Sequence, residues 1–224
     1  LILSGQNGGS GGFQVSGSNA FSINAGTLQL ANTNAFGNSG NNYSVANGAA
    51  IELAGGFSQT LNDGTTSGTI TLRGTGISGA GALRSISGNN TLGGNSTVGV
   101  SLAANSSIGV DAGQLVLNIP VTSASGTRSL TKVGVGTLAL SASGNFTGGT
   151  NISAGTLSFA NGALGSTGNI TFTGNSRLQW ASGNTQDVSS RIVMTDGVAS
   201  TFDTNSNNVT FAAGIGSASS GSLT

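Results

Sequence analysis

The chain has 224 residues and no net charge, and charged residues occupy only 5% of its positions. It contains no Cys and no His, while Gly, Ser, Thr and Asn together make up just over half of it. These numbers exclude disulfides, thiolate zinc sites and histidine-based catalysis or metal binding. Six basic residues are too few for a phosphate-binding stripe, and no apolar run approaches the ~18 residues of a membrane span, so neither a nucleic-acid partner nor membrane insertion is expected.

Short segments in which apolar and polar residues alternate recur along the chain. A period of two places the apolar side chains on one face of a β-strand. In chain order the clearest segments are 21–23, 28–30, 51–53, 70–72, 138–140, 157–159, 170–172 and 178–180. Turn-forming pairs such as Asn47-Gly48 and Asp196-Gly197 separate them. No window has a helical stripe, so the pattern predicts an all-β protein.

An internal repeat favours a solenoid over a sandwich or barrel. One octet occurs at 23–30, 110–117 and 152–159, with the shared glycine and leucine at Gly26 and Leu28, Gly113 and Leu115, and Gly155 and Leu157. The starting positions differ by 87 and 42, near multiples of 21 to 22. Phe21 and Ile23 also precede Tyr43 and Val45 by 22, as Ile170 and Phe172 precede Ile192 and Met194. We expect a right-handed parallel β-helix of about ten rungs, each of roughly 22 residues.

Residues 130–165 carry the motif Leu-x-Lys-x-Gly-x-Gly-Thr-Leu-x-Leu-Ser, followed by Gly-Gly-Thr-x-Ile-x-x-Gly-Thr-Leu. The motif positions include Lys132, Gly134, Gly136, Leu138, Leu140, Gly155 and Leu157. This segment resembles the passenger-associated repeat of bacterial autotransporters, and residues 1–37 resemble the later part of the same repeat with a longer insertion. The resemblance implies a β-helical passenger segment whose repeat serves secretion and stalk structure rather than catalysis.

From this resemblance we expect residues 1–224 to form a single solenoid segment, with repeat-like units at 1–37 and 130–165, within a longer passenger. It implies a place outside a Gram-negative cell, secreted or held at the outer membrane through a part beyond these residues. The expected partners are other cell-surface proteins, glycans or copies of the chain itself.

No catalytic, metal-binding or cofactor-binding site is expected. The acidic residues Glu52, Asp63, Asp111, Asp187, Asp196 and Asp203 are dispersed, and no Ser or Thr has an evident activating base. Asp203 and the Asn-rich residues after it are interpreted as a turn rather than a calcium loop. Lys132, the single lysine, is expected in solvent beside a tight corner formed by Gly134 and Gly136.

An aromatic column is predicted in the C-terminal half. Phe159, Trp180 and Phe202 follow one another at sequence intervals of 21 and 22, one rung each. Phe159 alternates in phase with Leu157, and Trp180 with Leu178, so these rings should face inward and stack on neighbouring rungs.

Three functions remain open. The first hypothesis is a non-catalytic stalk or adhesive module, because neutral walls covered by Ser, Thr and Asn lack long-range repulsion. The second is a subunit of an extracellular filament or coat, because the open ends of a β-helix are unpaired edges. The third is the scaffold of a polysaccharide-acting enzyme whose active site lies elsewhere.

Overall fold

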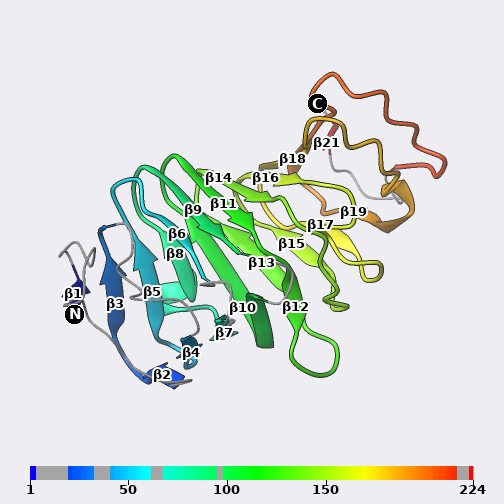
Figure 1. Ribbon diagram of the computed structural model, residues 1–224. Helices are drawn as coiled ribbons and strands as arrows, with labels where there is room; N and C mark the ends of the chain where they lie inside the picture. Colours follow the sequence, from blue (N-terminus) through cyan, green and yellow to red (C-terminus); the bar gives the residue numbers. More distant parts are fainter. Residues whose placement is uncertain (4–19, 33–40, 62–67, 95–97, 216–221, 224) are drawn as a thin grey trace.

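The computed structural model describes residues 1–3, 20–32, 41–61, 68–94, 98–215 and 222–223. Over these residues it is an all-β parallel solenoid of about seven turns. Figure 1 shows strands of successive turns lying side by side in chain order from the N-terminal to the C-terminal end. The predicted fold class is confirmed, and the number of turns is slightly lower than the ten rungs expected.

The longest stack of strands, which we call face A, begins with Ile2–Leu3 (β1) and runs the length of the solenoid. Its further members are Thr27–Leu30 (β3), Ala50–Leu53 (β5), Leu83–Ser85 (β8), the C-terminal part of Gly99–Val110 (β10), Leu130–Val133 (β13), Thr150–Ile152 (β15), Ile170–Phe172 (β17) and Ile192–Met194 (β19). Every pair in this stack is parallel.

Face B is a separate eight-stranded sheet. In chain order it consists of Ser58–Thr60 (β6), Asn89–Gly93 (β9), Gln114–Asn118 (β11), Thr137–Leu140 (β14), Gly155–Phe159 (β16), Ser176–Trp180 (β18), Ala199–Asp203 (β20) and Ser222–Leu223 (β21).

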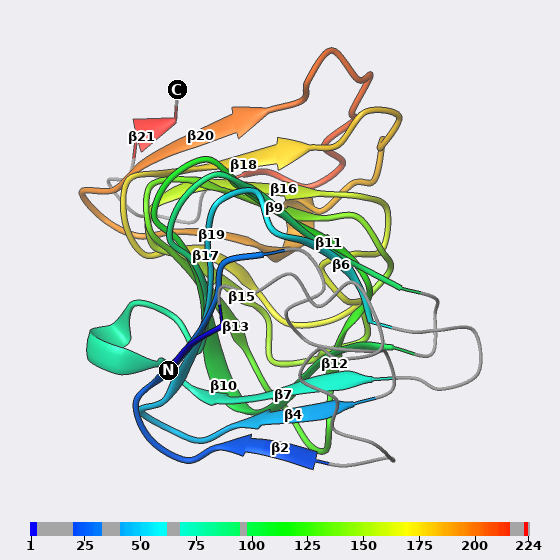
Figure 2. The same ribbon diagram turned by 60° about the vertical axis from the view of Figure 1, so that its left-hand side comes forward.

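Face C is shorter and stops halfway along the solenoid. It contains Ala20–Ile23 (β2), Asn42–Val45 (β4), Thr69–Gly74 (β7), the N-terminal part of β10 and Val121–Ser123 (β12). Figure 2 shows β2, β4 and β7 side by side on one flank, with β16, β18 and β20 on the opposite flank. Because β10 bends from face C into face A, these two faces form one 13-stranded sheet.

Two single-turn 3-10 helices lie beside face A. Ile77–Gly79 (η1) lies between β7 and β8, and Ser189–Arg191 (η2) leads into β19. No helix among the described residues has the length and apolar character needed to cross a membrane.

The core consists of columns of inward side chains that align from turn to turn. On face A one column runs through Leu28, Ile51, Leu83, Ile108, Lys132, Ile152, Phe172 and Met194. All of these side chains are buried. Inward alternation along each strand therefore produces one continuous core, as the period-two pattern predicts.

The length of a turn varies, and this explains the overestimated rung count. On face A, Glu52 pairs with Arg84 at a sequence separation of 32, whereas Thr131 pairs with Asn151 at a separation of only 20. The two predicted echoes are confirmed: Phe21 and Ile23 pair with Tyr43 and Val45, and Ile170 and Phe172 with Ile192 and Met194. A uniform period holds only where no residues are inserted between strands.

Candidate functional site

The expectation that Lys132 lies in solvent is wrong. Its side chain is 0% exposed, and it occupies the face A column between Ile108 below and Ile152 above. The inward position follows from the strand, because Lys132 alternates in phase with buried Leu130. That phase, visible in the sequence, was the signal that could have placed the lysine inside.

The buried ammonium is held by backbone carbonyl oxygens at the corner between faces A and B. Lys132 Nζ donates to the carbonyl oxygens of Val133 at 3.0 Å, Gly134 at 2.6 Å and Ala154 at 3.1 Å. The first two belong to its own rung and the third to the next. All three protons of the ammonium are therefore used, and they connect two successive corners.

Burial determines the electrostatics of this corner. Loss of solvent lowers the pKa of Lys132 from 10.5 to about 8, and the charge of Asp111 opposes that change. The ammonium is thus the main form at neutral pH, although a buried charge without partners would be strongly unfavourable. The three carbonyl oxygens supply the partners that keep it inside.

The glycines of the repeat form the same corner. Gly134 and Gly155 have φ values of 81° and 64°, a region that residues with a Cβ rarely adopt. A Cβ on Gly134 would also collide with the carbonyl oxygen of Val110, and one on Gly136 would lie 2.8 Å from that of Gly113. The corners of successive rungs stack too closely for side chains at these positions.

The second and third copies of the octet occupy equivalent places on the solenoid, and the first copy does not. Leu115 and Leu157 lie on face B, two turns apart through Leu138, whereas Leu28 lies on face A. The first copy therefore turns from face C into face A, and its distance from the second copy is not four rungs. The corner itself is shared, since Gly26, Gly113 and Gly155 have φ values of 71°, 66° and 64°.

The predicted aromatic column contains two of its three members. Phe159 and Trp180 pair in register, and their ring centroids lie 5.1 Å apart at a tilt of 59°. Phe202 instead pairs with Leu178, because paired positions on β18 and β20 differ by 24 in the sequence, two more than predicted. Its ring meets Phe172 edge-on at 5.3 Å, and the ring beside Trp180 is that of Phe211, at 5.6 Å.

Several other charged side chains form ion pairs with residues of neighbouring turns. Arg84 bridges Glu52 and Asp111 across neighbouring turns, and Arg177 pairs with Asp203. Among the described residues, no three His, Cys, Asp or Glu side chains gather into a possible metal site. Asp63 lies outside the described residues.

The predicted turn at Asp203 is also present. Its Oδ1 accepts a hydrogen bond from the backbone N–H of Asn205 at 2.9 Å. Hydrogen bonds from Gln179 and the Asn205 backbone, together with Arg177, hold the pKa of Asp203 below its usual value. This carboxylate is tied into the wall by its own rung and the preceding one.

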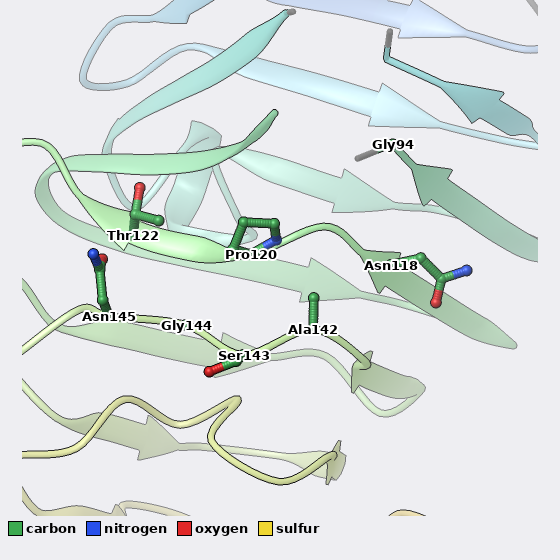
Figure 3. A pocket seen from close by; sticks show the side chains of 8 residues that line it. All are labelled: Gly94, Asn118, Pro120, Thr122, Ala142, Ser143, Gly144 and Asn145. Atoms are coloured by element: carbon green, nitrogen blue, oxygen red, sulfur yellow. The ribbon is translucent and has the colours of Figure 1, made fainter. Parts of the chain in front are cut away.

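A groove opens on the side of the solenoid where face C ends (Figure 3). It has a volume of about 450 Å³ and is lined by Gly94, Asn118, Pro120, Thr122, Ala142, Ser143, Gly144 and Asn145. These residues come from three successive turns: the end of β9, the connection from β11 into β12, and the segment after β14. None of them is charged, so the groove is a neutral surface of amides, hydroxyls and small apolar groups.

Comparison with known families identifies the segment around the Lys132 corner. Residues 130–159 match the model described as passenger-associated-transport-repeat. This segment is similar to a repeat family of autotransporter passengers. The matched residues span β13 to β16, so they contain two successive corners between faces A and B, with Lys132 and Gly134 in the first and Gly155 in the second. No curated protein and no solved structure matches the chain.

Proposed function

We propose that the chain is a non-catalytic stalk or adhesive segment of an autotransporter-type protein outside a Gram-negative cell. The observation that carries this proposal is the passenger-associated transport repeat, built into a continuous parallel β-helix whose turns share one core. A rod of this kind can hold a contact surface away from a membrane, because its strands are hydrogen-bonded from one turn to the next.

The arrangement of charge supports an adhesive rather than a catalytic role. Lys132, Arg84 and Arg177 bind carbonyl oxygens or carboxylates of the chain itself. Arg191 donates to four carbonyl oxygens of the preceding turn, those of Leu164, Gly165, Thr167 and Gly168, at 2.8–2.9 Å. These cations strengthen the wall, and they leave a surface with little field to repel another neutral surface.

The proposal is tested by displaying residues 1–224 on a Gram-negative host through a heterologous outer-membrane anchor. Displaying cells should aggregate, or attach to a host-cell layer, more than cells that carry the anchor alone at the same antibody-measured density. Equal attachment at equal display density would contradict the adhesive role. Polysaccharide turnover by purified protein that disappears on Asp187→Asn would instead favour an enzyme.

A further inference from the structure

The groove of Figure 3 has the size and structure of a ligand site. Its volume of about 450 Å³ lies in the range of small-molecule pockets, about 300–1,000 Å³. It is hollow because face C loses its strand here: β12 is paired on one side, and the following turn crosses at 142–145 without forming a strand. The backbone N–H of Asn145 donates to the carbonyl oxygen of Val121 at 3.1 Å and joins the two segments at this point.

Glycines line the groove at two of its edges. A Cβ on Gly94 would collide with Val98 Cγ2, and one on Gly144 would lie 2.6 Å from the carbonyl oxygen of Val121. The backbone therefore packs tightly behind the groove at these two points.

The polar side chains of the groove are available to a ligand. Asn118, Thr122, Ser143 and Asn145 supply amide and hydroxyl groups that both donate and accept hydrogen bonds. Within the part of the chain that the structure describes, none of these four side chains has a hydrogen-bond partner. Figure 3 shows Asn145 and Ala142 pointing toward the segment that carries Asn118, Pro120 and Thr122.

This chemistry selects among ligands. Without a charged lining residue, an ionic ligand would lose hydration and gain no opposite charge. A neutral sugar instead presents hydroxyls that match mixed donors and acceptors, and its C–H face can pack on the Pro120 ring and the Ala142 methyl group. We infer that the groove formed by residues 118–122 and 142–145 binds a neutral oligosaccharide. This inference rests on the proposed adhesive function and gives it a ligand class.

The test measures binding of the purified chain to soluble glycans by saturation-transfer NMR and titration. The probes are neutral oligosaccharides released from glycoproteins, neutral fragments of bacterial polysaccharide, and sialylated or uronate-containing oligosaccharides. The first two sets distinguish a host source from a bacterial one. Wild-type protein should bind at least one neutral probe and should bind acidic probes at least tenfold more weakly.

Two variants alter the groove without touching the core. Asn118→Ala/Asn145→Ala removes two amides, and Ser143→Trp fills the space from an exposed position. Each should weaken binding at least tenfold while the melting temperature stays unchanged. The matched control, Asn24→Ala/Asn208→Ala, removes two exposed amides that do not line this groove and should bind like wild type.

Absence of binding to every neutral probe, binding restricted to acidic probes, or groove variants that bind like wild type would overturn the inference. The cell assay separates this failure from failure of the proposed function. If cells displaying the groove variants attach as strongly as cells displaying wild type, the adhesive role stands and the groove is rejected as its binding site. Failure of wild-type cells to attach rejects the adhesive role, while the titration with purified protein still decides the groove.

Discussion

The two halves of the solenoid close their turns differently. From β4 to β12 a turn has strands on faces A, B and C, and the sequence separation of paired residues reaches 33 between Ser58 and Thr91. From β13 onward the described turns have strands on faces A and B only, and Lys132, Ile152 and Phe172 follow one another at intervals of 20. We call these the three-strand and two-strand turns.

The face A column continues through this change without interruption, so pairing between turns does not depend on how the third side is closed. In the two-strand turns, single hydrogen bonds and side-chain clamps replace the face C ladder. Gly144 N donates to Gly162 O at 3.0 Å, and Arg191 holds carbonyl oxygens of the segment 164–168. Lys132 lies in the first two-strand turn, where its ammonium joins two corners.

The largest expected effect tests the core of the two-strand turns. Trp180 is fully buried between Phe159 and Phe211, so Trp180→Ala leaves a cavity and should lower the free energy of unfolding by about 3–5 kcal/mol. Leu72→Ala, in a three-strand turn, should cost about 2–5 kcal/mol. Chemical denaturation measures both. A loss below about 1 kcal/mol for Trp180→Ala would show that this core is not packed as described.

The buried ammonium at the boundary predicts a pH dependence. Lys132 has a pKa of about 8 when folded and an ordinary value of 10.5 when unfolded, so between these values the unfolded chain holds a proton that the folded chain has released. The contribution of Lys132 to the free energy of unfolding should therefore rise with pH, by on the order of 3 kcal/mol between the folded and the unfolded pKa. The measurement is the denaturation midpoint at several pH values.

Lys132→Met is the matched variant, because it keeps most of the length of the side chain and removes the titrating group. Its stability should lack this rise, so the wild-type minus variant difference isolates Lys132. A difference that does not change with pH would mean that the amine is not buried when folded.

Replacing a corner glycine by alanine should cost more stability where neighbouring atoms lie close to its Cβ position. Gly126 has a φ of 63° and no atom near its Cβ position, so Gly126→Ala should cost only the strain of that conformation, about 1 kcal/mol. Gly134→Ala adds contact with Val110 O and should cost about 2–3 kcal/mol. Thermal melting of the two variants gives the comparison. Equal losses would argue against stacked corners at the repeat.

The smallest effect is expected at the surface. Arg177 is 48% exposed in its pair with Asp203, so Arg177→Ala should change stability by less than about 1 kcal/mol, and less still in high salt. A salt titration of the denaturation midpoint tests this. A loss of several kcal/mol would assign the pair a structural role that its exposure does not support.

The sequence predicts strands, inward positions and local register well, because these depend on period-two alternation between neighbours. The pairing of Phe21 and Ile23 with Tyr43 and Val45 is a case in which the predicted lag equals one turn. The same lag fails for Phe202, because the longer turn before it shifts the register by two positions. A lag in sequence cannot show which residues of a turn lie outside the paired strands.

The burial of Lys132 could have been inferred from its alternation with Leu130 along the strand, but the charge of the side chain predicted a position in solvent. Only the stacked corner reveals three carbonyl oxygens, one of them on the next rung at Ala154, that can satisfy the ammonium. The groove could not be predicted at all, since it arises from the loss of the face C strand after β12. Its residues carry no motif, and their proximity depends on three turns coming into contact.

Engineered disulfides test the register of the two-strand turns directly, because the chain has no Cys. Asn151 pairs with Thr171 on adjacent strands, within the Cα separation of about 4.4–6.8 Å that a disulfide requires. Asn151→Cys/Thr171→Cys should crosslink under mild oxidation, as measured by mass spectrometry after thiol alkylation. Asn151→Cys/Thr173→Cys, the pair expected for the uniform longer period, should remain largely reduced. Preferential crosslinking of the second pair would contradict the short turn and the position of Lys132 that follows from it.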